Sequence, residues 1–303
     1  MPQKVIVAGG TGFIGRPLVE ALVSAGHEVV VLARRDTQVT GARTAIWDVH
    51  SLGAWASEVE GAAAVINLVG EPINQRWTPE ARQRIVQSRT DSIAVLGAAI
   101  RSLGKPPLRW INASATGYYG NRGDEPLAEN SPPGTGFLAA TCLAWEQALE
   151  KAAPAWCPTC RVRIGVVLGR DGGALPTLSR LAKLVLGGPA GSGRQGMSWV
   201  HREDLVRLIA WLIEVAALPP VVNGTAPRPV SNRDFMAALR RAVRQPVGLP
   251  APTLGVQVIG RLIGVDPSLV LEGAYVTPEA ALRAGFTYQF PDVDEALEDL
   301  AGK

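Results

Sequence analysis

The sequence has few cysteines, and they are not arranged as a metal or redox centre. There are three in 303 residues. Cys157 and Cys160 have the spacing of a redox or metal-binding pair, but no second pair of Cys or His ligands lies nearby. We therefore interpret this pair as structural and predict no metal site.

Long apolar runs and concentrations of basic charge are also lacking. The most apolar run of the later chain, 206–222, is interrupted by Arg207, Glu214 and two prolines. The chain passes from Met1 directly into an apolar strand, so neither a membrane span nor a signal peptide fits. The net charge is +3, and the basic residues are scattered rather than gathered into a stripe that would follow a nucleic-acid backbone. We expect a cytoplasmic protein with a small-molecule substrate and neither a membrane nor a nucleic-acid partner.

The first 35 residues have the pattern of a strand, a glycine turn, a helix and a second strand. An apolar run at 5–7 precedes Gly9, Gly12 and Gly15, and apolar residues at helical spacing follow as far as residue 25. Gly9 permits the tight turn, Gly12 lets a pyrophosphate approach the backbone, and Gly15 lets the helix lie close to the strand. The sequence therefore predicts a dinucleotide-binding turn. We predict that Thr11, Phe13 and Ile14 in this turn also contact the dinucleotide.

The end of the second strand favours one dinucleotide. NAD-preferring sites place a carboxylate there, whereas an arginine can accommodate the 2′-phosphate of NADP. This strand ends in Arg34 and Arg35, with Asp36 one residue late, and guanidinium groups bind phosphate by charge-assisted bonds. We predict NADP(H) as the cofactor; a solvated strand end is the alternative explanation for the two arginines.

Later strands add further predicted cofactor contacts. A brief strand at 43–48 ends at Asp48, which either reaches an adenine amino group or serves as a turn residue. The continuous apolar run 62–70 is typical of a parallel strand buried on both faces, and its end should line the cofactor cleft. The residues predicted to contact the cofactor at this strand end are Leu68, Val69, Gly70 and Glu71. Arg89 and Arg163, farther along the chain, are also predicted to contact it.

The whole pattern predicts an α/β fold: a doubly wound parallel sheet (Rossmann fold) in residues 1–225 and a smaller, mainly helical substrate or lid lobe in 226–303. Helices are expected at 79–102, 136–151 and 175–186, and a sixth strand at 160–169. A strand from Leu108 opens into a loop at 114–120, and if it stays extended, Ser114, Thr116 and Tyr118 share one face. The C-terminal lobe should contain helices at 234–243 and near Val256, Pro267 and Pro278.

Four motifs together resemble the extended short-chain dehydrogenase/reductase superfamily, whose members include nucleotide-sugar epimerases and dehydratases. They are Gly9–Gly15, Ser114–Gly120, Arg163–Gly169 and Trp199–Asp204. The chain is most similar to an atypical subgroup labelled epimerase-family or cell-division-inhibitor-like, which shares Asn67–Pro72, Arg76-Trp77, Ser88-Arg89 and Leu186–Pro189. Relatives often dimerise through the long helices after strands four and five, so the resemblance leaves a homodimer open.

The chain departs from that superfamily at the proton-transfer residues. The resemblance implies a Tyr-x-x-x-Lys pair on the helix after the fifth strand, where the lysine lowers the tyrosine pKa. Leu138 and Cys142 occupy these two positions, and Ala115 occupies that of the carbonyl-polarising serine, with Ser114 one residue earlier. Neither Leu138 nor Cys142 can do this work.

Three functions therefore stay open. An NADP(H)-dependent oxidoreductase or epimerase could use a substitute acid, for which Tyr118 is the first candidate, Ser114 the second, and Glu71 and His201 weaker ones. The alternative is a non-catalytic NADP(H)-binding sensor or regulatory protein. A scaffold without cofactor is the third, and the intact glycines and the arginine pair argue against it.

Overall fold

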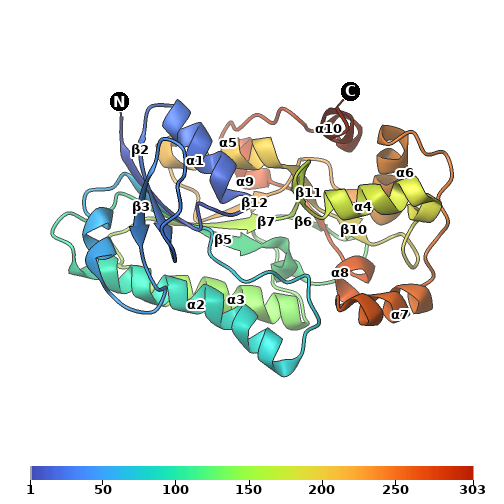
Figure 1. The fold of residues 1–303 in the computed structure, drawn as a ribbon, viewed down its shortest axis with the longest axis horizontal. Helices are drawn as coiled ribbons and strands as arrows, with labels where there is room; N and C mark the ends of the chain where they lie inside the picture. The colour runs from blue at the N-terminus through green and yellow to red at the C-terminus, as the bar shows by residue number, and fades with distance from the viewer. Residues whose placement is uncertain (1, 303) are drawn as a thin grey trace.

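Seven parallel strands form the central sheet, in the order β12-β7-β5-β4-β1-β2-β3 (Figure 1). The structure is a computed structural model that describes residues 2–302. The strands are β1 (Lys4–Ala8), β2 (Glu28–Ala33), β3 (Arg43–Ile46), β4 (Ala64–Asn67), β5 (Trp110–Ala115), β7 (Thr159–Ile164) and β12 (Val221–Gly224). Because β1 lies between β4 and β2, the direction in which strands are added reverses there, which is the switch point of a doubly wound sheet. The predicted fold class is confirmed.

Helices cover both faces of this sheet, and the alternation of side chains along β1 decides which core each residue enters. Val5 and Val7 belong to the core under α1 (Gly15–Ser24) and α5 (Arg202–Glu214). Ile6 and Ala8 belong to the core under α2 (Pro79–Ser102) and α3 (Phe137–Ala152), on the opposite side of the sheet (Figure 1). All four residues are fully buried, as expected for a parallel strand covered on both faces.

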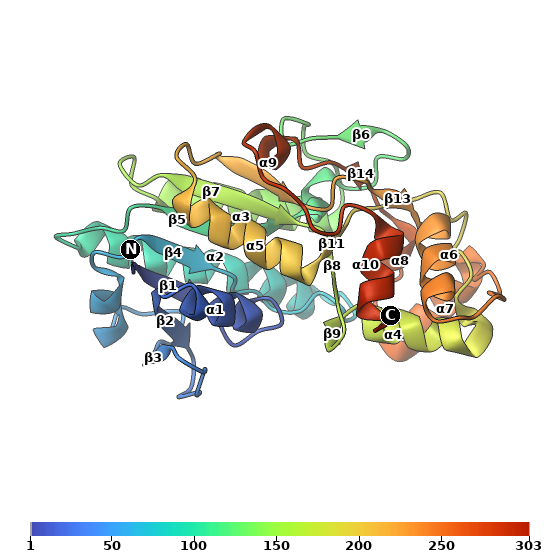
Figure 2. The same cartoon turned by 90° about the horizontal axis from the view of Figure 1, so that it is seen from above.

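A smaller lobe lies beyond the carboxyl ends of the strands (Figure 2). Its main helices are α4 (Leu175–Leu181), α6 (Asn232–Ala242), α7 (Thr253–Ile263), α8 (Ser268–Leu271) and α10 (Val293–Leu300). Between α8 and α10 the chain returns to the main sheet, where α9 (Glu279–Arg283) packs against β12 and buries Ala281. Of the helices within residues 2–302, none combines the length and apolar character needed to cross a membrane.

The lobe is joined to the sheet by short strand pairs rather than by a flexible linker. β8 (Val166–Gly169) pairs with β9 (Gly172–Gly173) and β11 (Trp199–His201). β10 (Gly196–Met197) pairs with β13 (Val230–Ser231), and β6 (Pro126–Leu127) pairs with β14 (Tyr275–Val276). These pairings hold together segments that are far apart in the sequence.

The sixth strand is not continuous as predicted, because it changes partners at Gly165. The Gly165 N–H donates to the Gly224 carbonyl at 3.1 Å, whereas the Val166 N–H donates to the Ser198 carbonyl at 2.7 Å. A Cβ atom on Gly165 would lie 2.4 Å from that Ser198 oxygen. Only glycine fits this approach, and β8 therefore leaves the central sheet to pair with β11.

Two other local predictions were wrong. The chain after β5 turns into the 3₁₀ helix η2 (Thr116–Tyr119), so Ser114, Thr116 and Tyr118 do not share an extended face. The helix expected over 175–186 ends as α4 at Leu181; one wide turn, η3 (Ala182–Leu186), follows and is broken at Leu184 and Val185. The helices η1 (Ala54–Val59) and α10 were not predicted.

Candidate functional site

The glycine turn is shaped by backbone atoms that leave no room for side chains at two positions. Gly9 has a positive φ of 82°, and a Cβ there would lie 3.1 Å from the Leu68 carbonyl carbon at the end of β4. A Cβ on Gly15 would lie 2.2 Å from the Gly9 oxygen. A Cβ on Gly12 would meet one atom, the Gly9 oxygen at 3.4 Å, which is an ordinary contact. Gly9 and Gly15 are therefore required by the fold, whereas Gly12 leaves open space beside the turn.

The start of α1 suits a bound phosphate. The helix has no side-chain N-cap and no acidic residue in its first turn. The N–H groups of Phe13 and Ile14 donate to no group within residues 2–302. Unpaired N–H groups and the positive end of the helix dipole form an anion-binding site. The residues present therefore fit the pyrophosphate of a dinucleotide.

A pocket of about 530 Å³ lies between this turn and the end of β2, and its lining residues are Thr11, Ala33, Arg34, Arg35 and Thr37. Both arginines are exposed, and neither forms an ion pair with another described residue. None of the five lining residues is acidic. The pocket therefore offers free guanidinium groups at the position that distinguishes a 2′-phosphate from a 2′-hydroxyl.

Asp48 is occupied in a turn after β3. Its Oδ1 accepts the N–H groups of His50 and Ser51, both at 2.8 Å, and its Oδ2 accepts the Ser51 hydroxyl. These bonds, led by the hydroxyl of Ser51, lower the pKa of Asp48 to about 2. The turn role considered from the sequence is present in the structure, and the contact with adenine stays a prediction.

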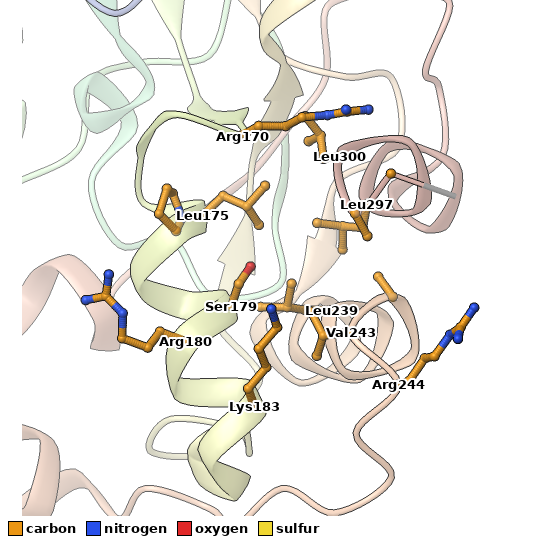
Figure 3. A pocket seen from close by; sticks show the side chains of 14 residues that line it. Arg170, Leu175, Ser179, Arg180, Lys183, Leu239, Val243, Arg244, Leu297 and Leu300 are labelled. Carbon is orange, nitrogen blue, oxygen red and sulfur yellow. The ribbon is translucent and has the colours of Figure 1, made fainter.

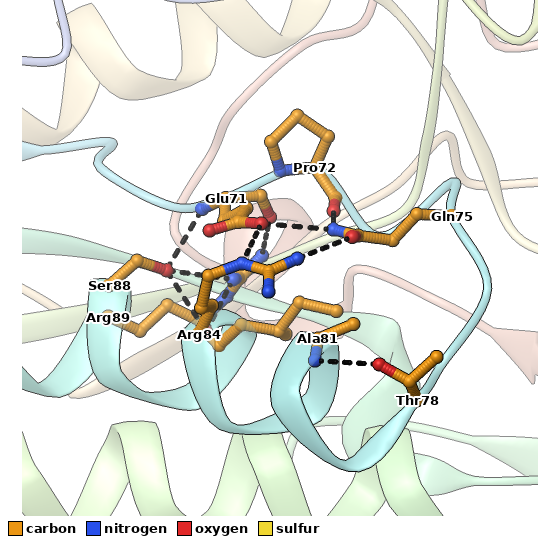
Figure 4. A network of polar contacts seen from close by, with 9 residues as sticks. Glu71, Pro72, Gln75, Thr78, Ala81, Arg84, Ser88 and Arg89 are labelled. Atoms are coloured by element: carbon orange, nitrogen blue, oxygen red, sulfur yellow. Dashed lines mark hydrogen bonds and ion pairs between the residues drawn. The ribbon is translucent and has the colours of Figure 1, made fainter.

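The segment after β4 is held by two side chains from α2 (Figure 4). Ser88 accepts the Glu71 N–H at 3.0 Å, and the Arg89 guanidinium donates to the Glu71 carbonyl at 3.1 Å. Arg89 lies so close to Gly70 that a Cβ there would be 3.1 Å from its central carbon. The same guanidinium lies 4.9 Å from the Trp145 ring centre, and burial lowers its pKa. Arg89 therefore fixes the strand exit at which Leu68, Val69, Gly70 and Glu71 are placed.

The Glu71 carboxylate is paired rather than free. Gln75 donates to its Oε1 at 3.2 Å, and Arg84 donates to the same oxygen at 3.1 Å (Figure 4). The Gln75 hydrogen bond and the Arg84 pair lower the Glu71 pKa. An ionised carboxylate in this network is a poor proton donor.

Leu138 and Cys142 face the η2 turn, as their positions in the superfamily motif require. A Cβ on Gly117 would lie 3.2 Å from the Leu138 Cβ and 3.7 Å from the Cys142 Sγ. Burial raises the pKa of Cys142 to about 12, with the charge of Glu146 adding to the effect. The thiol is therefore neutral near pH 7, and neither side chain supplies the cation or the phenol of a Tyr-x-x-x-Lys pair.

Beside them lies a buried polar network that sequence reasoning missed. Glu146 accepts two hydrogen bonds from Arg163, at 2.8 and 2.9 Å, and one from the Ser114 hydroxyl at 2.7 Å. Arg163 also donates to the Tyr119 hydroxyl at 2.9 Å, and that hydroxyl donates to Asn223 at 2.7 Å. Burial opposes the charge on Arg163, but the hydrogen bonds and charge of Glu146 outweigh it and raise the pKa. Burial raises the pKa of Tyr119 to about 12.

This network changes how two predicted site residues are placed. Arg163 was expected to contact the cofactor, but its side chain is 4% exposed and its guanidinium is directed to protein groups. The Ser114 hydroxyl is buried and donates to Glu146.

A helical spacing of buried positions, 142, 145 and 149, indicates that Glu146 is on the inner face of α3. A carboxylate on that face needs a cationic partner, so this signal was available in the sequence.

Tyr118 lies at the edge of the network with a free hydroxyl. The Arg163 guanidinium carbon is 3.4 Å from its ring centre, and its ring meets that of Tyr119 edge-on, with centres 5.2 Å apart. The side chain is half-buried, and its hydroxyl makes no hydrogen bond within the described part of the chain. Tyr118, one of the predicted proton donors, is therefore held by its ring, while its hydroxyl has no hydrogen-bond partner among the described residues.

His201 has a structural position at the start of α5. Its Nδ1 accepts the Glu203 N–H at 3.2 Å, and its ring stacks on Phe290 with centres 4.0 Å apart. Its Nε2 is 3.4 Å from the Asp299 carboxylate on α10. Burial lowers the His201 pKa, although Asp299 opposes the shift. The histidine therefore joins α5 to α10 rather than to the glycine turn.

These observations agree with comparisons to known proteins. The profile of the NAD dependent epimerase/dehydratase family matches residues 5–223. The chain belongs to this family. A second profile, a domain of unknown function (DUF1731), matches residues 251–300. The resemblance to the extended short-chain dehydrogenase/reductase superfamily is confirmed, and the division at residue 225 stays a prediction.

Several members of the family are similar to this chain over most of their length. The human epimerase family protein SDR39U1 is 33% identical over 303 residues, covering 98% of this chain and 99% of that protein. The chloroplastic SDR39U1 homologue of Arabidopsis thaliana is 37% identical over 97% of this chain and 86% of its own length. The crystal structure of human SDR39U1 (isoform 2) with NADPH has a TM-score of 0.88 at 32% identity, covering 99% of both chains.

Proposed function

We propose that this chain is an NADP(H)-binding oxidoreductase or epimerase-like enzyme acting on a small carbonyl or sugar-type substrate. The pocket bordered by Arg34 and Arg35, with no carboxylate in its lining, is the observation that carries the cofactor assignment. The human relative solved with NADPH supports it. In this proposal the N–H groups of Phe13 and Ile14 bind the pyrophosphate, the open side of Gly12 lets it approach, and the arginines bind the 2′-phosphate.

NADP(H), when bound, supplies the hydride acceptor or donor. The protein must supply the accompanying proton transfer, and Tyr118 is the group we propose for it. Its hydroxyl is open, its ring is held against Arg163, and it follows the carboxyl end of β5, where ligands of such sheets bind. Ser114 is the weaker choice because its hydroxyl is already donated to Glu146.

The cofactor assignment is tested by titrating the purified protein with NADPH and with NADH and following energy transfer from tryptophan to the reduced nicotinamide. Arg34→Glu should weaken NADPH binding by about tenfold to a hundredfold, the range of one or two charged hydrogen bonds, and leave NADH nearly unchanged. Arg283→Glu, at an exposed arginine of α9 that does not line this pocket, is the matched control. Equal losses for both nucleotides in Arg34→Glu would refute the phosphate contact.

The catalytic part is tested separately by screening carbonyl and sugar substrates for oxidation of NADPH. Tyr118→Phe removes only the hydroxyl and should slow turnover by a factor on the order of 10² or more while NADPH binding is retained. Unchanged turnover would exclude Tyr118 as the proton donor.

The alternative function is a non-catalytic NADP(H)-binding sensor, and the positions of Leu138 and Cys142 favour it, because neither can transfer a proton near pH 7. Tight NADPH binding without turnover of any substrate in the screen would support this alternative.

We further propose a cytoplasmic location, supported by three cysteines that are all free, and a homodimer through α2 and α3. Light scattering would test the dimer.

A further inference from the structure

A pocket of about 610 Å³ in the smaller lobe is lined by basic side chains whose place in the fold explains them (Figure 3). Arg180 and Lys183 lie in the last turns of α4 and η3, and Arg244 follows the end of α6. A cation near a helix C-terminus stabilises the helix dipole, so these charges need no ligand. Arg89 differs from them, because it lies in the middle of α2, away from both ends of the helix.

The half-buried Arg89 guanidinium carries a charge that no carboxylate balances. Of the carboxylates nearby, Glu71 is paired with Arg84 and Glu146 with Arg163, and Arg89 forms no ion pair with another described residue. Its shorter hydrogen bonds go to two main-chain carbonyls, which carry no net charge (Figure 4). Burial lowers the pKa of Arg89, but an arginine side chain stays protonated in proteins. The exit of β4 therefore keeps one net positive charge.

This charge lies beside the position at which the superfamily motif has its lysine. Cys142 occupies that position on α3, and Trp145, about one turn further along, is on the same side of the helix. The Arg89 guanidinium carbon is 4.9 Å from the Trp145 ring centre. The charge of Arg89 also acts against the rise in the Cys142 pKa, as a nearby cation does. Arg89 thus supplies from α2 the cation that position 142 lacks.

Arg89 also lies at the part of the sheet edge over which the nicotinamide half of the cofactor should extend. The glycine turn follows β1, and the Arg34 pocket lies on the β2 side of it. A dinucleotide crosses a doubly wound sheet at the switch point, so its other half extends over the end of β4, on the opposite side of β1. Gly70 follows β4, and a Cβ on it would lie 3.1 Å from the Arg89 guanidinium carbon.

The two redox forms of the cofactor differ in charge at this end. The nicotinamide ring of NADP⁺ is a cation, whereas that of NADPH is neutral, and the phosphates are the same in both. A fixed positive charge near the ring therefore repels the oxidised form and not the reduced one.

We propose that Arg89 takes the place of the motif lysine as the cation at the nicotinamide and makes this site bind NADPH more tightly than NADP⁺. The inference rests on the cofactor part of the proposed function and needs no catalytic residue. It favours carbonyl reduction, in which NADPH is the starting form and the carbonyl gains a hydride and a proton. Epimerisation by transient oxidation begins with NADP⁺, the form that Arg89 disfavours.

Dissociation constants for NADPH, from tryptophan energy transfer, and for NADP⁺, from competition with NADPH, test this. We expect the unchanged protein to bind NADPH about tenfold or more tightly than NADP⁺. Arg89→Gln removes the charge and should reduce this preference by about tenfold, whereas Arg89→Lys keeps the charge and should preserve most of it. Arg101→Gln, in the last turn of the same helix and about 18 Å away along its axis, should leave the preference unchanged.

A second pair of variants is needed because Arg89 also holds the Glu71 carbonyl, so its loss disturbs that segment as well. Ser88→Asp and Ser88→Asn leave Arg89 in place and differ from each other only in charge. The Ser88 hydroxyl lies 3.5 Å from the Arg89 guanidinium, so the aspartate would balance its charge and should reduce the preference for NADPH relative to the asparagine.

Equal weakening of both nucleotides in Arg89→Gln, with the preference unchanged, would overturn the inference and leave Arg89 as a support of the strand exit. The same preference in the two Ser88 variants would also overturn it. Failure of the unchanged protein to bind either nucleotide would overturn the cofactor assignment together with this inference.

Discussion

Gly12 and Gly15 lie in the same turn, but the atoms around them differ. A methyl group on Gly15 would overlap the Gly9 oxygen and the Gly10 α-carbon, both backbone atoms that cannot rotate away. Gly15→Ala should therefore lower the free energy of unfolding by about 1–3 kcal/mol, the usual cost of overpacking. Urea denaturation measures it, and a stability equal to that of the unchanged protein would contradict the tight packing of α1 on β1.

Gly12→Ala should instead affect NADPH binding more than the stability of the fold. Its methyl group would meet only the Gly9 oxygen at an ordinary distance, so stability should change little. The methyl group would occupy the space through which phosphates approach the backbone, and NADPH affinity should fall by about tenfold or more. If Gly12→Ala binds NADPH normally, the pyrophosphate does not lie where we propose.

At the scale of elements, one ion pair joins α3 to β7 inside the protein. Glu146 and Arg163 have side chains 8% and 4% exposed, and Glu146→Gln would leave a buried guanidinium without its counter-charge. We expect the free energy of unfolding to fall by about 3–5 kcal/mol, because a broken buried pair leaves an uncompensated charge.

A second ion pair between α3 and β7 provides a matched control for Glu146→Gln. Glu150 on α3 pairs with Arg161 on β7, but the Glu150 side chain is 57% exposed. Glu150→Gln should therefore cost about 0–1 kcal/mol. Equal costs for the two substitutions, measured by urea denaturation, would show that burial of the Glu146 pair has no energetic consequence.

At the scale of the whole molecule, His201 makes stability depend on pH. It joins α5 to Phe290 and α10, and its pKa is lowered by burial. The unfolded chain therefore binds a proton more readily than the folded protein, so stability is lost as the pH falls from about 6.5 through the folded pKa.

Comparing unfolding free energies at pH 7.5 and 5.5 measures this contribution. His201→Gln removes it and should give a shallower decline between the two pH values, whatever its effect on stability at pH 7.5. An identical decline in both proteins would show that His201 is not protonated on unfolding.

The sequence by itself determined much of the fold and indicated the features on which the proposed cofactor site rests. The glycine turn, the arginine pair and the boundaries of α2 are local features, since each depends on residues within a few positions of one another. The family resemblance likewise followed from short motifs. Leu138 and Cys142 were placed by counting along one helix, and they do face the η2 turn.

Only the tertiary structure decided what depends on contacts between distant segments. The break at Gly165 arises because the Ser198 carbonyl approaches it, and the partners of Glu146 come from β5 and β7. No local spacing encodes such approaches, because strand pairing and side-chain burial are settled by the packing of the whole chain.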